Sequence, residues 1–268
     1  MHRIELYNSI TSDPGFDWSK VDLLLPSAAH IGDRFIRKRE GLSKPKEILI
    51  APTNLINPEQ FPFFERRWEP PYRIGLVGNF VPKKRQYSAI EMMYDVKAEF
   101  GDKFWLDIAG EKGMWSGYGN PEYYQNCLDL VDELGLKDVV RMYAKIPHEG
   151  MKDFYNREHI VLSNSNEEGT HVSIAEGIST GCTAFVHTWR GAKDVYPDTV
   201  ARHFHSPMEF LGLCRSFLQC VKNQELPAAS EKMAGLFRST LGDWGKYGRL
   251  VEVIESKVEA RKKARAVK

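Results

Sequence analysis

The chain has 268 residues, enough for one large or two modest domains with a buried core. Its 37 basic and 36 acidic residues leave a net charge of +1, so nucleic acid is not an expected partner. No apolar run approaches the length of a membrane span, no signal peptide opens the chain, and the four cysteines form neither a CxxC pair nor a zinc-binding spacing. These features predict a cytoplasmic protein with reduced thiols.

The N-terminal part of the chain contains short extended and helical patterns. The apolar runs 21–25 and 47–50 are predicted strands, and residues 28–39 between them have a helical pattern. Residues 58–71 then carry several prolines, which predicts a linker or a domain boundary.

A regular alternation of strands and helices begins after the prolines. Strands are predicted over 73–77, 104–109, 139–143, 159–162 and 183–186, and helices over 84–100, 122–134, 149–155, 171–181 and 207–222. Strands separated by helices predict an α/β fold with a doubly wound, mostly parallel sheet. The last part, from residue 230 onward, has a helical pattern and a basic end. We therefore divide the chain into residues 1–70, 71–225 and 226–268.

Residues 167–177 are the most informative segment. Glu168 is predicted in a loop that follows a strand, and Glu176 about one turn inside the next helix. A helix N-terminus attracts phosphate through its free N–H groups and partial positive charge, and a carboxylate beside it can accept hydrogen bonds from sugar hydroxyls. Phosphate and hydroxyls together indicate a nucleotide-sugar. The alternative is a capping box of Ser173 and Glu176, which would only stabilise the helix.

A second loop, after the first strand of the alternation, carries Lys83 and Lys84 next to Arg85. Ligands of doubly wound sheets bind at the carboxyl ends of the strands, so this loop and the Glu168 loop can face one crevice. A lysine there could meet a diphosphate bound at the helix that begins near His171. The alternative is that the three basic residues form a solvated charge cluster.

In their order and spacing these segments resemble the donor-binding half of family 4 glycosyltransferases, over roughly residues 21–197. The family's Glu-x7-Glu motif is matched by Glu168 and Glu176, and its glycine-arginine-x-x-x-x-lysine loop by Gly78 and Lys84. Further similar segments are 108–110, 134–140, 189–192 and 195–197.

The resemblance implies the two-domain GT-B architecture. Residues 71–225 would be the Rossmann-like nucleotide-sugar donor-binding domain, residues 1–70 the end of an acceptor domain, and 226–268 C-terminal helices. The implied activity is retaining transfer of a sugar from a nucleotide-diphosphate-sugar, without a metal or another cofactor. The chain agrees in lacking Asp-x-Asp, the motif that usually holds the metal in the other large glycosyltransferase architecture. The acceptor could be a glycan, a lipid or a protein.

The resemblance also implies roles for single residues. Glu168 would hold the transferred sugar near its reacting carbon, and His2 matches an active-site histidine of the acceptor domain, so both are catalytic candidates. Lys84 would contact the diphosphate and Glu176 the ribose hydroxyls. The other donor-binding candidates are Gly78, Asn79, Gly110, Gly169, Thr170, His171 and Val172.

Two positions leave alternatives open. Asn79 stands where the family has an arginine, so Arg85 or Arg190 could supply the missing charge. His171 either faces the donor or makes a structural hydrogen bond at the start of its helix.

Two other functions are compatible with the same residues. The chain could be a nucleotide-sugar-binding module, or a subunit of a split transferase whose acceptor domain comes from a second chain. The sugar-nucleotide epimerases that share the two-domain fold are a further possibility, but the Glu-x7-Glu pairing favours transfer.

Overall fold

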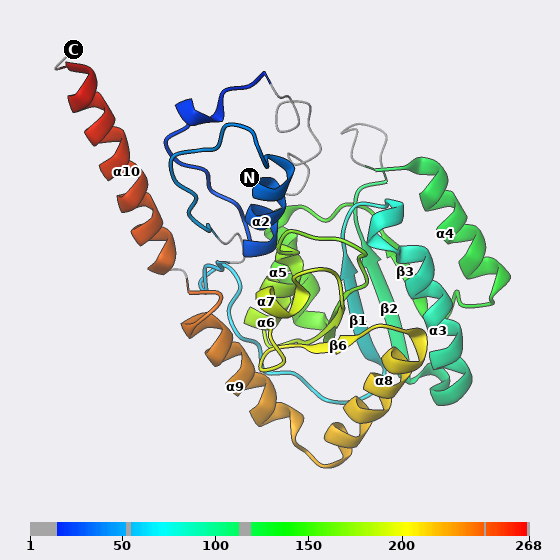
Figure 1. Ribbon diagram of the computed structural model, residues 1–268. Helices are drawn as coiled ribbons and strands as arrows, with labels where there is room; N and C mark the ends of the chain where they lie inside the picture. The colour runs from blue at the N-terminus through cyan, green and yellow to red at the C-terminus, as the bar shows by residue number, and fades with distance from the viewer. Residues whose placement is uncertain (1–14, 52–54, 113–118, 244, 267–268) are drawn as a thin grey trace.

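The centre of the molecule is a six-stranded parallel sheet with the strand order β3-β2-β1-β4-β5-β6 (Figure 1). The structure is a computed structural model that describes residues 15–51, 55–112, 119–243 and 245–266. Its strands are β1 (Tyr72–Val77), β2 (Phe104–Ala109), β3 (Val140–Tyr143), β4 (Ile160–Ser163), β5 (Thr183–His187) and β6 (Arg202–Phe204). The strand order reverses between β1 and β4, which is the position where doubly wound sheets bind their ligands.

Helices cover both faces of this sheet, which confirms the predicted α/β fold. One face carries α3 (Gln86–Phe100), α4 (Pro121–Glu133) and α8 (Pro207–Lys222), and the other carries α5 (His148–Arg157), α6 (Val172–Ser179) and α7 (Ala192–Val195) (Figure 1). The other helices of the described residues are α2 (Ala29–Lys38), α9 (Leu226–Ser239) and α10 (Gly245–Ala266), with single 3-10 turns at Trp18–Lys20, Pro82–Lys84 and Gly101–Lys103. No helix in the described ranges is both long enough and apolar enough to span a bilayer.

Each face of the sheet has its own apolar core, because successive side chains of a strand point to opposite faces. In β4, Ile160 and Leu162 pack with α3 and α8, whereas Val161 packs with α5 and α6. A Cβ atom at Gly177 of α6 would lie 2.2 Å from a methyl carbon of Val161. Glycine at this position therefore lets α6 lie directly on β4, and this contact positions the start of α6.

The prediction of two strands near the N-terminus is wrong. The two segments run parallel to each other but share only one bridge, between Leu24 and Ile48, and they do not join the sheet. Pro26, which has no N–H group, follows directly and limits the pairing. The helix predicted between them is confirmed as α2, whose Ile31 and Phe35 are buried in the same core as α6.

The other differences from the predicted elements are local. β6 and α7 were not predicted, because three and four residues are too few for a hydrophobic period to be recognised. The helix expected from residue 84 begins at Gln86, since Arg85 has a φ of +54° and ends the preceding 3-10 turn. The C-terminal helical region is divided into α9 and α10 near Gly242, where a Cβ would lie 2.3 Å from the ring of Phe237.

The proline-rich residues 58–71 begin with a turn at 58–60 and then cross the molecule without forming a helix or a strand (light blue in Figure 1). Arg66 fixes this passage. Its guanidinium donates hydrogen bonds to the carbonyl oxygens of Glu158 at 2.6 Å, Thr180 at 2.5 Å and Tyr155 at 3.0 Å. The passage is therefore bound to the sheet domain, and a domain boundary at residue 70 stays a prediction.

Candidate functional site

Two loops meet at the carboxyl ends of β1 and β4, as expected for the strands on either side of the switch point. The backbone N–H of Asn166 donates to the carbonyl oxygen of Lys83 at 2.9 Å. The side-chain amide of Asn164 donates to the carbonyl oxygen of Arg85, also at 2.9 Å. The loop after β1 and the loop after β4 thus form one surface.

A lysine and a glutamate from these two loops form an ion pair. Lys84 Nζ lies 2.5 Å from Glu168 Oε1, and the two side chains are only 15% and 12% exposed. Burial alone would raise the pKa of Glu168, but the charge that His171 carries once it is protonated, together with the Lys84 ammonium, outweighs burial and lowers that pKa to about 2. Glu168 is therefore a carboxylate at any pH in the neutral range. The geometry does not support the alternative that Lys84 belongs to a solvated charge cluster.

His171 lies at the junction of the Glu168 loop and α6, and its ring is buried. The carbonyl oxygen of Val77, 3.2 Å from Nε2, can only accept, so Nε2 carries the proton and Nδ1 accepts from the Ser163 hydroxyl at 2.6 Å. Burial, and then the charge of Lys84, lower the pKa of His171 to about 4. Both ring nitrogens of this neutral histidine bind the protein, which favours the structural hydrogen bond over contact with a donor.

The backbone just before α6 is held in an unusual conformation. His171 has a φ of +48°, and a residue other than glycine adopts this backbone angle at a cost of about 1–2 kcal/mol. The Tyr196 hydroxyl donates to the carbonyl oxygens of Thr170 at 2.6 Å and His171 at 3.1 Å, and so stabilises this turn. α6 begins at Val172. The Ile174 N–H donates to the carbonyl oxygen of His171 at 3.0 Å, whereas the N–H groups of Val172 and Ser173 have no partner within the helix. Gly169 to Val172 therefore form a backbone segment suited to an anion.

Glu176 lies one turn farther along α6. Its Oε2 accepts a hydrogen bond of 2.7 Å from the hydroxyl of Tyr155 in α5. Burial raises the pKa of Glu176, and the bond from Tyr155 offsets part of that effect. The capping-box alternative is wrong, because the N-cap residue is His171 and Ser173 is already the second residue of the helix.

One glycine lets the loops after β1 and β2 touch, and a second one gives room to the side chain of Lys84. A Cβ at Gly110 would lie 2.0 Å from the carbonyl oxygen of Gly78, so position 110 excludes every side chain. Gln86 donates to the carbonyl oxygens of Gly78 at 3.1 Å and Asn79 at 2.9 Å. A Cβ at Gly78 would lie 3.2 Å from the side chain of Lys84, which folds back over this glycine.

Arg85, one of the two candidates to replace the missing arginine, is directed toward β5. One nitrogen of its guanidinium lies 2.8 Å from His187 Nε2 and 3.3 Å from Asn166 Oδ1. The Nδ1–H of His187 donates to the carbonyl oxygen of Ser165 at 3.1 Å, so Nε2 accepts from Arg85. Arg190, the other candidate, is exposed in the loop after β5.

Several residues at this surface have no signature in the sequence. His30 of α2 donates from Nε2 to the carbonyl oxygen of Glu168 at 2.9 Å, and Arg34 of the same helix forms an ion pair with Glu167. Tyr196 lies in a segment that the family resemblance singled out, but nothing in the sequence assigned its hydroxyl to the Glu168 loop.

Two further predictions concern His2 and a metal ion. His2 lies outside the described residues. Within the ranges that the structure describes, no three or more His, Cys, Asp or Glu side chains are grouped as a metal site would require.

The arrangement as a whole combines groups that suit one kind of ligand. A lysine and a helix N-terminus offer positive charge to a diphosphate. Two carboxylates, one beside that lysine and one a turn inside the helix, offer acceptors to hydroxyl groups.

Comparison with known proteins supports this assignment of the surface. The family model described as "Glycosyl transferases group 1" matches residues 59–232, which include both loops and α6. No curated protein sequence matches the chain.

Solved structures resemble the chain at low sequence identity. Sucrose-phosphate synthase from Thermosynechococcus elongatus is 16% identical, with a TM-score of 0.69 over 90% of this chain. A glycosyltransferase from Rickettsia africae is 12% identical, with a TM-score of 0.73 over 94%. The pneumococcal O-GlcNAc transferase GtfA, solved with UDP and GlcNAc, is 12% identical, with a TM-score of 0.67 over 93%. The chain spans 60%, 66% and 48% of their respective lengths. These likenesses confirm the GT-B type of fold.

Proposed function

Because the chain belongs to the group 1 glycosyl transferase family, we propose that it moves a sugar from a nucleotide-diphosphate-sugar to an acceptor. The observation that carries this proposal is the meeting of Lys84, Glu168 and the start of α6 at the switch point of the sheet. A glycan, a lipid and a protein all remain open as the acceptor.

The donor diphosphate would bind between Lys84 and the N-terminus of α6. Negative charge develops on the diphosphate as the bond to the sugar breaks, and a fixed cation with oriented N–H groups stabilises that charge. These groups would do the work of a metal ion, so we propose that transfer is metal-independent. Lys84 would have to exchange its carboxylate partner for a phosphate oxygen when the donor binds.

The two carboxylates would divide the rest of the donor between them. Glu168, ionised and beside Lys84, would accept hydrogen bonds from the transferred sugar near its reacting carbon, as in a retaining transfer. Glu176 would accept hydrogen bonds from the ribose hydroxyls, while the Tyr155 hydroxyl holds its other side in place. Gly78, Asn79 and Gly110 would line the approach to the diphosphate.

Two further observations support the choice of donor and location. GtfA, which shares the fold, was solved with UDP and GlcNAc, a nucleoside diphosphate and a sugar.

All four cysteines are free, which is consistent with a reducing compartment, so we infer a cytoplasmic location.

A second candidate function is donor binding without turnover by this chain itself. It is favoured by Asn79, which removes one charge expected at the diphosphate, and by the carboxylate that already occupies Lys84. In that case a second chain would supply the acceptor side of a split transferase.

Ligand titrations test the donor site. Thermal shift with nucleoside diphosphates and their sugars identifies the base, and a ligand at about 100 times its Kd stabilises by about 2.7 kcal/mol. Lys84→Ala should then weaken binding of the diphosphate by about 1.5–3 kcal/mol and leave the nucleoside unaffected. Lys83→Ala is the matched control and should change affinity by a few tenths of a kcal/mol. Equal small effects at both lysines would refute the proposed donor site.

Turnover experiments separate the two candidate functions. Donor hydrolysis or transfer by the purified chain indicates an enzyme, whereas binding alone indicates a binding subunit. Activity, or donor binding, should persist in the presence of a chelator. Complete loss with rescue by manganese or magnesium would contradict metal independence.

A further inference from the structure

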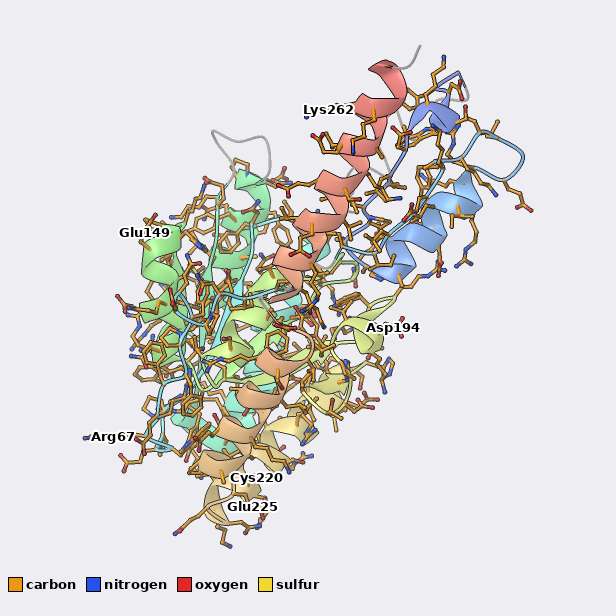
Figure 2. The ribbon with its side chains drawn as sticks, turned by 90° about the vertical axis from the view of Figure 1, so that its left-hand side faces the viewer. Arg67, Glu149, Asp194, Cys220, Glu225 and Lys262 are labelled. Atoms are coloured by element: carbon orange, nitrogen blue, oxygen red, sulfur yellow. The ribbon has the colours of Figure 1, made fainter. Side chains whose placement is uncertain are left out.

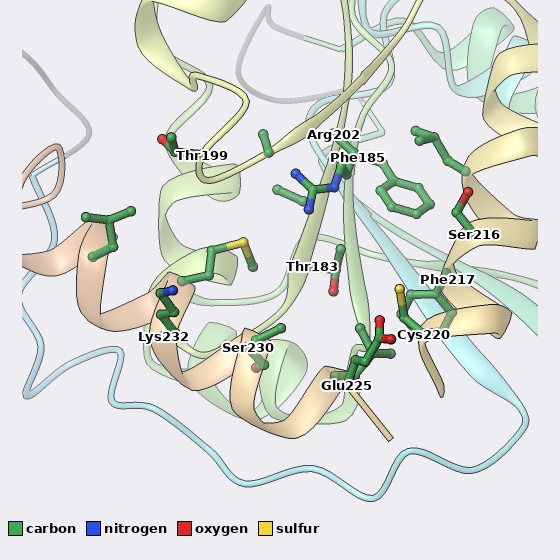
Figure 3. Close-up of a pocket in the computed structure, with 17 residues that line it drawn as sticks. Thr183, Phe185, Thr199, Arg202, Ser216, Phe217, Cys220, Glu225, Ser230 and Lys232 are labelled. Atoms are coloured by element: carbon green, nitrogen blue, oxygen red, sulfur yellow. The ribbon is translucent and has the colours of Figure 1, made fainter. Parts of the chain in front are cut away.

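A cavity of about 460 Å³ lies at the free edge of the sheet, between α8 and α9 (Figure 3). It is bordered by the first residues of β5 and β6, whereas the candidate donor site lies at the carboxyl ends of β1 and β4. Figure 2 shows Cys220 and Glu225, two of its lining residues, far from the end of the molecule where Lys262 of α10 lies. Because the strands of the sheet are parallel, their first residues and their carboxyl ends lie at opposite edges of the sheet, so the cavity is separate from the donor site.

The cavity exists because β6 is shorter than β5. β6 pairs only with residues 185–187 of β5, so Thr183 and Ala184 extend past the point where β6 begins. α8 and α9 continue on the two sides of this edge, and no strand formed by the described residues fills the space between them. Its volume is within the usual range for small-molecule sites, about 300–1,000 Å³.

The walls of the cavity are mainly apolar. Phe185, Phe217 and Leu226 are buried residues of the protein core that also border this space. The other apolar lining residues are Ala184, Ala201, Leu213, Ala229, Met233 and Leu236. A ligand with an apolar body would therefore lose contact with water here, at a gain of about 25 cal/mol for each Å² of apolar surface that it buries.

Positive charge is present at the same cavity. Arg202 and Lys232 both line it, and the guanidinium of Arg202 points into it in Figure 3. Neither side chain forms an ion pair with a carboxylate of the described residues, and Arg202 donates only to the carbonyl oxygen of Asp198, at 2.9 Å. Glu225, the one acidic lining residue, accepts a hydrogen bond from the side-chain amide of Asn223 at 2.9 Å.

We propose that this cavity binds a small soluble amphiphilic anion, with an apolar body and one carboxylate or a similar anionic group. The apolar body would lie against Phe185, Phe217 and Met233, and the anionic group would pair with Arg202 and Lys232. An uncharged or cationic molecule of the same size would gain the apolar contacts alone.

Cys220 provides a direct readout of binding. It lines the cavity and is partly exposed, whereas Cys127, Cys182 and Cys214 are buried. Iodoacetamide should therefore alkylate Cys220 first, as measured by peptide mass. Decanoate below its micelle concentration should slow this alkylation at least fivefold at a fixed pH of about 8.5, and decyltrimethylammonium should not.

Variants separate binding in the cavity from a general effect of the amphiphile. The double variant Arg202→Gln, Lys232→Gln should lose the protection by decanoate, and Lys222→Gln, an exposed lysine of α8 outside the cavity, should keep it. Ala229→Phe should fill the cavity and abolish protection without the loss of either cation. No protection of the native chain by decanoate, equal protection by the cationic amphiphile, or unchanged protection in the double variant would each overturn the proposal. Nucleoside diphosphate binding, measured in parallel, should be unaffected by decanoate.

Discussion

Replacing Lys84 by methionine removes the cation beside Glu168 and keeps a chain of similar length. In the native protein the two groups are 2.5 Å apart and 15% and 12% exposed, so little water is available to solvate a lone carboxylate. We therefore expect the variant to leave Glu168 without its compensating charge, and so to lose stability even when no ligand is bound.

The size of the loss follows from the pKa of Glu168. That pKa falls from 4.5 to about 2 on folding, a difference of about 2.5 units. At about 1.4 kcal/mol for each unit, the ionised form is favoured by about 3.5 kcal/mol in the folded protein. His171, once it is protonated at low pH, shares this effect with Lys84, so we expect Lys84→Met to lower the free energy of unfolding by about 2 kcal/mol.

The pH dependence gives the assay its specificity. A depressed carboxyl pKa stabilises the fold fully above the unfolded pKa of about 4.5, and this stability is lost as the pH falls toward 2. Urea unfolding of the native chain and of Lys84→Met should therefore differ most at pH 7 and converge only as the pH approaches 2. The double variant Lys84→Met, Glu168→Gln should recover at least about 1 kcal/mol, because it buries no lone charge.

Lys152→Met, at an exposed position of α5, is the control and should change the free energy of unfolding by less than about 0.5 kcal/mol. If the effect of Lys84→Met is no larger than this control, or is the same at pH 7 and pH 2, the ion pair does not hold Glu168 ionised and the electrostatic account of the site is wrong.

Three further predictions concern the same surface. Glu176→Ala should weaken nucleoside diphosphate binding by about 1–3 kcal/mol in calorimetry, and an unchanged affinity in a folded variant would remove Glu176 from the site. The pKa of His171 is lowered to about 4 on folding, so the unfolded chain binds a proton at a higher pH than the folded chain does. The free energy of unfolding in urea should therefore fall as the pH is lowered from 6.5 to 4, and the same dependence on pH in a His171→Gln variant would contradict this. Gly110→Ala places a Cβ 2.0 Å from the carbonyl oxygen of Gly78 and should lower Tm markedly, so a native Tm would show that the two loops can separate freely.

Much of the fold could be predicted because its elements are long and periodic. α8 has the predicted bounds, and β2 matches its predicted range, since each is a continuous pattern of one period. The short β6 and α7 could not be recognised in this way. The extended segments near the N-terminus have a strand-like composition, but whether they join the sheet depends on partners far away in the chain.

The candidate site was predictable to the extent that topology brings residues together. Lys84 and Glu168 follow neighbouring strands at the switch point, so the strand order alone places their loops side by side. The conformation of His171 was not predictable, because its positive φ is stabilised by Ser163 and Val77 through the tertiary fold. His30 was not predictable either, since it is separated from Glu168 by 138 positions and belongs to no motif.

The position of Arg66 has a practical consequence for dissecting this chain. A fragment that begins at the predicted boundary, near residue 71, would lack the guanidinium that binds the carbonyl oxygens of Tyr155, Glu158 and Thr180. These carbonyl groups lie at the C-terminal ends of α5 and α6, where carbonyl oxygens have no donor within their own helix. Without the guanidinium of Arg66 the last turns of both helices would be less stable. An expression fragment of the donor domain should therefore start before Phe61, whose ring is also buried, and retain the whole proline-rich passage.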